Sequence, residues 1–182
     1  MLSGDKSTFA IESEIRDAID SFVYCKFRFW VAGNPIGDWN EEVVLGVLRH
    51  SANVLMRYQG DRCLDVASNM NTEQLWQHID RIANSDDPDD LHISLEGRYR
   101  QRYLLHEISY ESVGKVCKII VVDRNDGYQR LLWKCNGDNE IQELTLPKLT
   151  VDNVVNEFLD WAEQNQKSMM TEKSMGSDSI DH

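Results

Sequence analysis

Long apolar runs are missing from this sequence of 182 residues: none exceeds five residues, so no segment is long enough to span a bilayer. The residues after Met1 form no apolar stretch, so we expect no secretory signal and a cytoplasmic protein. Proline is scarce, with 3 residues, and no Pro- or Gly-rich linker or internal repeat divides the chain. These absences predict one domain over residues 1–166, which is long enough for a single sizeable core.

Motifs for metal binding and catalysis are also missing. The sequence has four cysteines, Cys25, Cys63, Cys117 and Cys135. They show no C-x-x-C spacing and no histidine at ligand spacing, which favours reduced, buried thiols over a zinc site. The five histidines are scattered, and the chain contains no G-x-S-x-G, Walker or G-x-G-x-x-G pattern. We therefore expect a protein without catalytic residues, metal or cofactor.

What is abundant is negative charge. The chain has 31 acidic and 19 basic residues, which gives a formal net charge of −12. Such a surface repels nucleic-acid phosphates and favours a basic protein partner, with fast, salt-dependent association. An apolar content of 41% with 5 Trp indicates a folded, globular body.

Strict alternation predicts two strands near the N-terminus. In the first, residues 9–16, apolar positions alternate with polar ones. The second, residues 21–32, has one face for the core, formed by Val23, Cys25, Phe27, Phe29 and Val31. The opposite face carries Tyr24, Lys26, Arg28 and Trp30. We expect the two strands to pair as an antiparallel hairpin through residues 17–20.

Helical periodicity follows in two segments. A capping pattern at Asp38 predicts a helix from there to about Tyr58, with Val47 on its packed side, and a second helix is predicted over residues 72–84. Alternation over residues 91–95 and roughly 98–110 predicts two further strands.

Residues 116–145 are predicted to form a β meander. Asn125-Asp126-Gly127 joins its first two strands and Asn136-Gly137 the next two. A three-residue loop with Gly127 in the left-handed region places Cys117 opposite Cys135 and gives one fully apolar face. This register also sets Lys118 opposite Lys134, at a modest like-charge cost.

The C-terminal part is predicted to be a last helix and a tail. The helix starts at Thr150 and runs to about Gln166, and its polar side carries Asp152, Glu157, Asp160 and Glu163. Residues 167–182 lack periodicity and are expected to be a disordered tail. The fold class is α+β: a mostly antiparallel sheet of six to seven strands with about three helices packed on one side.

The first forty residues carry a family resemblance. Gly4-Asp5, the strand Phe9-Ala10-Ile11-Glu12-Ser13-Glu14-Ile15 and the segment Lys26-Phe27-Arg28-Phe29-Trp30-Val31-Ala32-Gly33-Asn34-Pro35-Ile36-Gly37-Asp38 are similar to the opening of the immunity protein 42 family. Members of this family resemble one another in being small bacterial antidotes encoded beside polymorphic or contact-delivered toxins. The resemblance implies a protein that binds and neutralises a cognate toxin, without catalysis.

Three groups of residues are candidates for contact with this partner. They are the acidic run Asp86, Asp87, Asp89 and Asp90, the helix face Asp152, Glu157, Asp160 and Glu163, and the turn residues Asp38 and Trp39. Trp39 would supply an apolar anchor, although the turn could equally be a structural corner. For the acidic run, a plain solvated loop is the commoner interpretation, and the run lacks the alternating ligands and glycine of a calcium loop.

Two further patterns are open to more than one interpretation. Arg98, Arg100 and Arg102 alternate along one strand face, as in a phosphate binder or, more commonly, a charged edge strand, and their role stays open. Glu12 and Glu14 share a strand face, either as paired carboxylates or as a plain polar face.

The alternatives to immunity are a small acidic regulatory protein that mimics nucleic acid and an enzyme with an unrecognised site. A toxin gene beside this one would favour immunity. The toxin's activity, the contact surface and the oligomeric state do not follow from the sequence.

Overall fold

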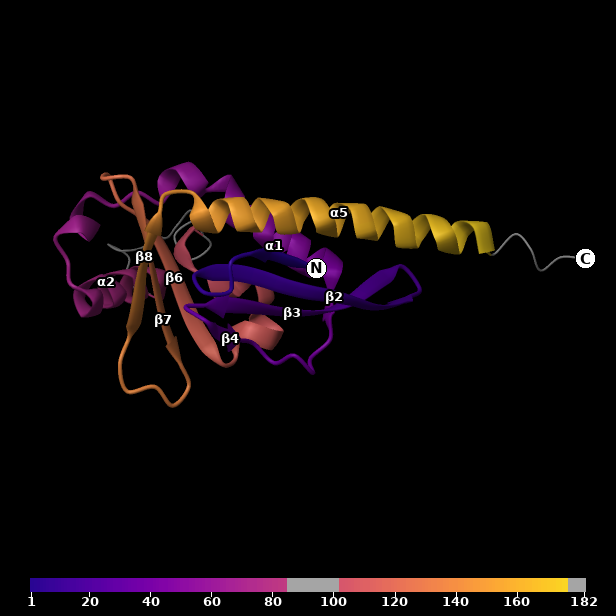
Figure 1. Cartoon of the computed structure of the whole chain (residues 1–182), viewed down its shortest axis with the longest axis horizontal. Helices are drawn as coiled ribbons and strands as arrows, with labels where there is room; N and C mark the ends of the chain where they lie inside the picture. Colours follow the sequence, from indigo (N-terminus) through magenta and orange to yellow (C-terminus); the bar gives the residue numbers. More distant parts are fainter. Residues whose placement is uncertain (85–101, 177–182) are drawn as a thin grey trace, which may run out of the picture.

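The structure is a computed structural model that describes residues 1–84 and 102–176, with side chains up to Met169. The described residues form two antiparallel sheets with the helices α1 (Leu45–Arg57), α2 (Thr72–Asn84) and α5 (Thr150–Gly176), which confirms the α+β class. The long helix α5 runs along the first sheet (Figure 1). Across the described ranges, no helix has the length and apolarity that a membrane-spanning helix requires.

The first sheet has the order β1 (Leu2–Gly4), β2 (Phe9–Ile19), β3 (Phe22–Val31) and β4 (Asn34–Ile36). The short β5 (Val43–Val44) also pairs with β3. The predicted alternation is confirmed, because Val23, Cys25, Phe27, Phe29 and Val31 are all buried. The hairpin is tighter than expected, since β2 continues to Ile19 after a register shift between Ile15 and Asp17.

The second sheet consists of β6 (Cys117–Asp123), β7 (Tyr128–Cys135) and β8 (Gln142–Pro147). The predicted register is confirmed: Cys117 lies opposite Cys135, Lys118 opposite Lys134, and Gly127 has φ +86°. The expectation of one sheet of six to seven strands is wrong, because the described strands form two separate sheets, one of five strands and one of three. Periodicity identifies the buried face of a strand but not the edge that it pairs with.

One hydrophobic core joins the two sheets to α1 (Leu45–Arg57) and α5. It includes Phe27 and Phe29 of the first sheet, Ile119 and Val121 of the second, and Phe158 of α5. The other face of the second sheet is covered by α2 (Thr72–Asn84), at the predicted bounds, through Leu75 and Ile79. The outer face of the first sheet has no such helix among the described residues, and its β3 side chains, Tyr24, Lys26, Arg28 and Trp30, are half-buried.

Two helix boundaries differ from the prediction. Helix α1 begins at Leu45 and not at Asp38, because the Asp38 carboxylate accepts a 2.8 Å hydrogen bond from the Asn40 amide, which forms a local turn, and β5 then pairs with β3. Helix α5 continues to Gly176, where a disordered tail from residue 167 was expected, and Met169 packs against the core. Residues 177–182 lie outside the described part.

The strand expected over residues 98–110 is wrong for its described portion. Leu105–Ser109 forms the 3₁₀ helix η3 and Tyr110–Gly114 the single-turn π-helix η4. Leu105, Ile108 and Val113 are buried, and spacings of three and five residues suit a helical turn and not a strand. The strand expected over residues 91–95, with Arg98 and Arg100, lies outside the described residues, whereas Arg102 donates to the Asp61 carbonyl at 3.3 Å.

Candidate binding surface

The outer face of β2 and β3 carries a row of stacked cations and indoles. The Arg28 guanidinium carbon lies 4.9 Å from the centre of the Trp30 ring and 4.4 Å from that of Trp39. Lys6 Nζ lies 4.1 Å from the Trp30 ring and Lys26 Nζ 5.8 Å from the Trp39 ring. Each contact is a cation–π interaction, so the five side chains support one another. We call these residues and Glu12 the stacked surface.

Glu12 holds one end of this row in place. Its carboxylate accepts hydrogen bonds from Lys6 Nζ at 3.2 Å, Arg28 Nε at 2.7 Å and Trp30 Nε1 at 2.8 Å. Burial would raise the pKa of Glu12, but the hydrogen bonds from Trp30, Arg28 and Lys6 and the charge of Arg28 together hold the pKa below its ordinary value of 4.5. The side chains are therefore fixed before any partner arrives, which lowers the entropic cost of binding.

A glycine turn brings Trp39 to this surface. Gly37 has φ +127°, and a Cβ there would lie 3.2 Å from Arg28 Cβ and 3.1 Å from Val113 Cγ2. Glycine therefore lets the chain pass close over β3 in a conformation that other residues rarely adopt. The Asp38 amide donates to the Ser112 carbonyl at 2.8 Å. In this turn Asp38 shapes the backbone, and Trp39, which is half-buried, joins the stack.

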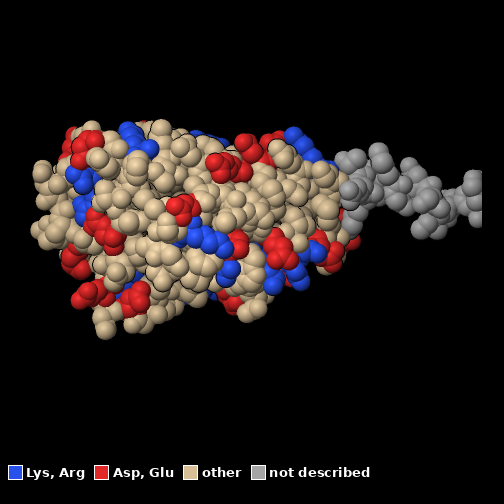
Figure 2. All heavy atoms as spheres, viewed as in Figure 1, with Lys and Arg blue, Asp and Glu red and all other residues tan. Residues whose placement is uncertain are grey.

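Figure 2 shows Lys and Arg atoms interleaved with Asp and Glu atoms across the region where Figure 1 places β2 and β3. Glu14 lies on the same face beside Arg16, at 2.6 Å, so Glu12 and Glu14 each pair with cations and do not form a carboxylate pair. Stacked indoles and guanidinium groups are the side chains most enriched among residues that dominate protein interfaces.

A second polar surface lies between α1 and α5. A cleft of about 410 Å³ is lined by Arg49, Asn53, Asn156, Leu159, Asp160 and Glu163, and we call it the carboxylate cleft. Glu163 is ion-paired with Lys167 at 2.6 Å, and the hydrogen bond from Lys167, with the charges of Lys167 and Arg49, lowers the pKa of Glu163. The structure thus brings Asp160 and Glu163 together. Glu157, also exposed, instead accepts a hydrogen bond from Ser3 Oγ of β1.

The expectation that Asp152 belongs to an exposed acidic face is wrong. Asp152 is fully buried and paired with Arg62, which is also fully buried. Gln129 Nε2 donates to Asp152 at 2.7 Å and to Asp123 at 2.8 Å. Burial lowers the pKa of Arg62, and the charge of Asp123 opposes that shift. No sequence signal could have found this pair, because its members lie 90 residues apart.

Asp86, Asp87, Asp89 and Asp90 lie outside the described residues, so contact through the acidic run stays a prediction. The other candidates are divided between two surfaces. Trp39 lies on the outer side of the first sheet, whereas Asp160 and Glu163 lie between the two helices that pack on its inner side.

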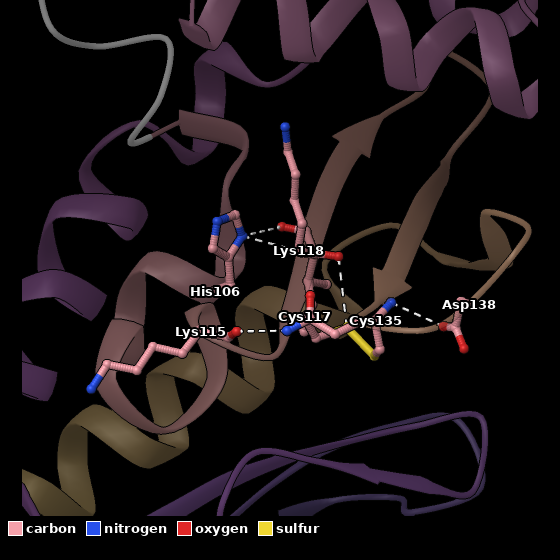
Figure 3. The surroundings of a disulfide bond; sticks show 8 residues. His106, Lys115, Cys117, Lys118, Cys135 and Asp138 are labelled. Atoms are coloured by element: carbon pink, nitrogen blue, oxygen red, sulfur yellow. Dashed lines mark hydrogen bonds between the residues drawn. A yellow bond between two sulfur atoms is a disulfide. The ribbon is translucent and has the colours of Figure 1, made fainter.

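The cysteines also differ from the prediction. Cys117 and Cys135, in adjacent strands, are joined by a disulfide, where four reduced thiols were expected (Figure 3). Asp138 accepts a hydrogen bond from the Cys135 amide, and His106 bonds the backbone of Ile119 beside this pair (Figure 3). Burial raises the pKa of the free Cys25 thiol to about 11, so it is a poor nucleophile. Within the described ranges, no three His, Cys, Asp or Glu residues are placed to hold a metal.

The first sheet carries a pre-formed surface of indoles and cations, residue types that are typical of protein interfaces. The comparisons identify the family: the model of the family described as Immunity protein 42 matches residues 1–161, so the chain belongs to this family. It is an immunity protein, whose role is to neutralise a toxin by binding. The family match extends well beyond the forty residues on which the sequence resemblance rested.

A solved structure supports the fold. The chain is similar to the crystal structure of CdiI from Burkholderia dolosa AUO158, with a TM-score of 0.66 and 19% identity, over 88% of this chain and 99% of that one. No match was found among curated proteins.

Proposed function

We propose that this immunity protein neutralises its cognate toxin by direct binding in the cytoplasm, and that the stacked surface is its main contact. The observation that carries this proposal is the Arg28 guanidinium between the indoles of Trp30 and Trp39. Such a group presents apolar and ionic side chains that are already held in position and lose little freedom on binding.

The carboxylate cleft has a different part in this proposal. Its exposed Asp160 and Glu163 contribute to the field of a chain with net charge −12, which attracts a basic toxin and speeds the encounter. Neutralisation by binding requires no chemical step. The absence of enzymatic activity is a separate point and stays a prediction. The nucleic-acid-mimic alternative is weakened, because Asp152, one of its four helix carboxylates, is buried.

The test uses the toxin domain encoded beside this gene. Cells that co-express this domain with the parent chain should survive, and calorimetry should give one-to-one binding. The double variant Arg28→Ala, Trp39→Ala should raise Kd by about 100-fold, roughly 2.7 kcal/mol, and abolish protection. Tyr128→Ala removes an exposed aromatic elsewhere and should change Kd by less than about twofold.

Two results would contradict the proposal. If the parent chain neither binds this domain nor protects the cells, the pairing with this toxin is wrong. If the parent binds and the double variant binds equally well, the contact surface is wrong although the immunity function stands.

A further inference from the structure

A groove lies between the start of α1 and the segment η3–η4. Its volume is about 480 Å³, and its apolar walls are Val43, Val44, Val47, Leu48, Ile108 and Tyr110. Val47 is 61% exposed and Tyr110 52% exposed, so two large apolar side chains of the groove remain in contact with water. Exposed apolar residues that cluster in one concave site are typical of a binding site, whereas single exposed apolar residues scattered over a surface are common and carry no such meaning.

Local backbone features build this groove. The pairing of β5 with β3 delays the start of α1 to Leu45, so Val47 lies in the first turn and points outward and not into the core. On the opposite wall, Tyr110 begins a π-helical turn. This conformation is rare in proteins overall, and where it occurs it is often at a functional site. A Cβ at Gly114 would lie 2.7 Å from Tyr110 Cδ2, so glycine at this position leaves room for the Tyr110 ring.

The lining also includes three carboxylates, those of Glu42, Glu107 and Glu111. Each has a cation or histidine nearby: Arg16 Nε is 3.7 Å from Glu42, Lys115 pairs with Glu111, and His106 Nε2 is 3.9 Å from Glu107. The Glu42 and Glu111 pairs are exposed, and exposed ion pairs contribute little and exchange readily. An incoming Lys or Arg can therefore take these acceptors.

The groove is continuous with the stacked surface along the chain and through a hydrogen bond. Glu42 and Val43 follow Trp39 by three and four residues. The Asp38 amide bonds the Ser112 carbonyl of η4, the turn whose Tyr110 and Glu111 line the groove. A partner seated on Trp39 therefore reaches the groove within one ordinary interface.

We propose that this groove is a second contact for the toxin and takes one apolar side chain flanked by Lys or Arg. The inference rests on the proposed toxin binding and adds the chemistry of the toxin segment. The apolar walls select the anchor and the carboxylates select its basic neighbours, so the two features together specify one kind of occupant.

The test compares the parent with the variant Val47→Gln, Tyr110→Ser, with the toxin domain encoded beside the gene as the probe. Kd should rise at least tenfold, mainly through faster dissociation, because both side chains would be buried in the complex. The matched control Val66→Gln, Tyr128→Ser changes two similarly exposed side chains elsewhere and should leave Kd within about twofold. Glu42→Gln, Glu111→Gln should slow association, because these are the exposed acceptors of the groove.

Each other outcome overturns the inference. Equal affinity of parent and groove variant means that the toxin does not use the groove, while the toxin binding itself stands. A parent that is dimeric by light scattering, with a monomeric groove variant, assigns the groove to a second copy of the chain. Failure of the parent to bind the toxin domain overturns both this inference and the proposed function.

Discussion

The stacked surface and the carboxylate cleft are both polar, but they are built differently. In the stacked surface, indoles separate the cations and Glu12 accepts three hydrogen bonds, so every member has its position set by a neighbour. In the cleft, Asp160 is exposed and Glu163 is paired with Lys167, which is itself 74% exposed. A fixed surface suits slow dissociation, whereas exposed charges suit fast association.

Net charge alone therefore does not locate an interface. The acidic composition suggested α5 as a contact surface, yet the carboxylates of this helix lie in three different environments. Asp152 is buried with Arg62, Glu157 bonds β1, and only Asp160 and Glu163 line a cleft. Arg28, Trp30 and Trp39, which belong to residue types common in interfaces, lie on the outer side of the first sheet.

The largest expected effect separates the two faces of β3. Phe29→Ala empties a fully buried position beside Phe9 and Phe27 and should cost about 3–5 kcal/mol. Trp30→Ala, one residue on and facing outward, should cost clearly less, because its ring is only half-buried. Thermal unfolding of the two variants checks this. A greater loss for Trp30→Ala would show that the outer face is part of the core of the fold.

The next prediction separates the buried from the exposed carboxylates of α5. Asp152→Ala removes the carboxylate that is paired with the buried Arg62 guanidinium, so that Asp123 would then supply the opposing charge, and it should cost about 3 kcal/mol of unfolding free energy. Asp160→Asn, on the exposed side of the same helix, should stay within about 0.5 kcal/mol. Urea denaturation at pH 7 measures both. Similar values for the two variants would mean that the buried pair does not stabilise the fold.

A smaller effect is expected for the carboxylate that holds the stack. Glu12→Gln should cost about 1–2 kcal/mol at pH 7, since it weakens charge-assisted hydrogen bonds. The folded-state pKa of Glu12 is lowered, so its contribution is present above the unfolded-state value near 4.5 and is lost as pH falls through the folded-state pKa.

The difference in stability between parent and Glu12→Gln should therefore shrink below pH 4.5. Glu14→Gln, an exposed neighbour on the same face, is the control and should cost less than about 0.5 kcal/mol at pH 7. A parent–variant difference that does not vary with pH would mean that ionised Glu12 does not hold the stack.

The smallest effect is expected at the C-terminus. Truncation after Gln166 removes the last turns of α5. Among the removed residues, Met169 packs against the core. We expect a loss of at most about 1 kcal/mol, because helix ends fray and few contacts are removed. A larger loss, measured by the midpoint of thermal unfolding, would mean that residues 167–182 belong to the domain.

Much of the fold follows from local pattern. Alternation in β3 predicted its buried face, and the loop ending in Gly127 predicted the register of β6 and β7 down to Cys117 opposite Cys135. These features depend on neighbouring residues alone. The start of α1 was mispredicted because an Asx turn at Asp38 uses the same sequence pattern as a helix cap.

The candidate site depends on contacts between distant segments, so the sequence predicted it only in part. Trp39 was a candidate anchor, with a structural corner as the alternative, and its contact with a partner stays a prediction. The outward positions of Arg28 and Trp30 followed from alternation. The three side chains can stack only because the turn at Gly37 returns the chain over β3. Periodicity in the sequence does not predict such a turn. The partnership of Arg62 with Asp152 likewise joins two elements that no local pattern connects.

We expect the two surfaces to act on different steps of toxin binding. Stopped-flow kinetics with the adjacent toxin domain, at low and physiological salt, tests this expectation directly. Arg28→Ala, Trp39→Ala should raise the dissociation rate about 100-fold and leave the salt dependence of association unchanged. Asp160→Asn, Glu163→Gln should slow association several-fold at low salt and leave dissociation within about twofold. If the cleft variant instead accelerates dissociation and the stacked-surface variant binds like the parent, the assignment of the two surfaces is wrong.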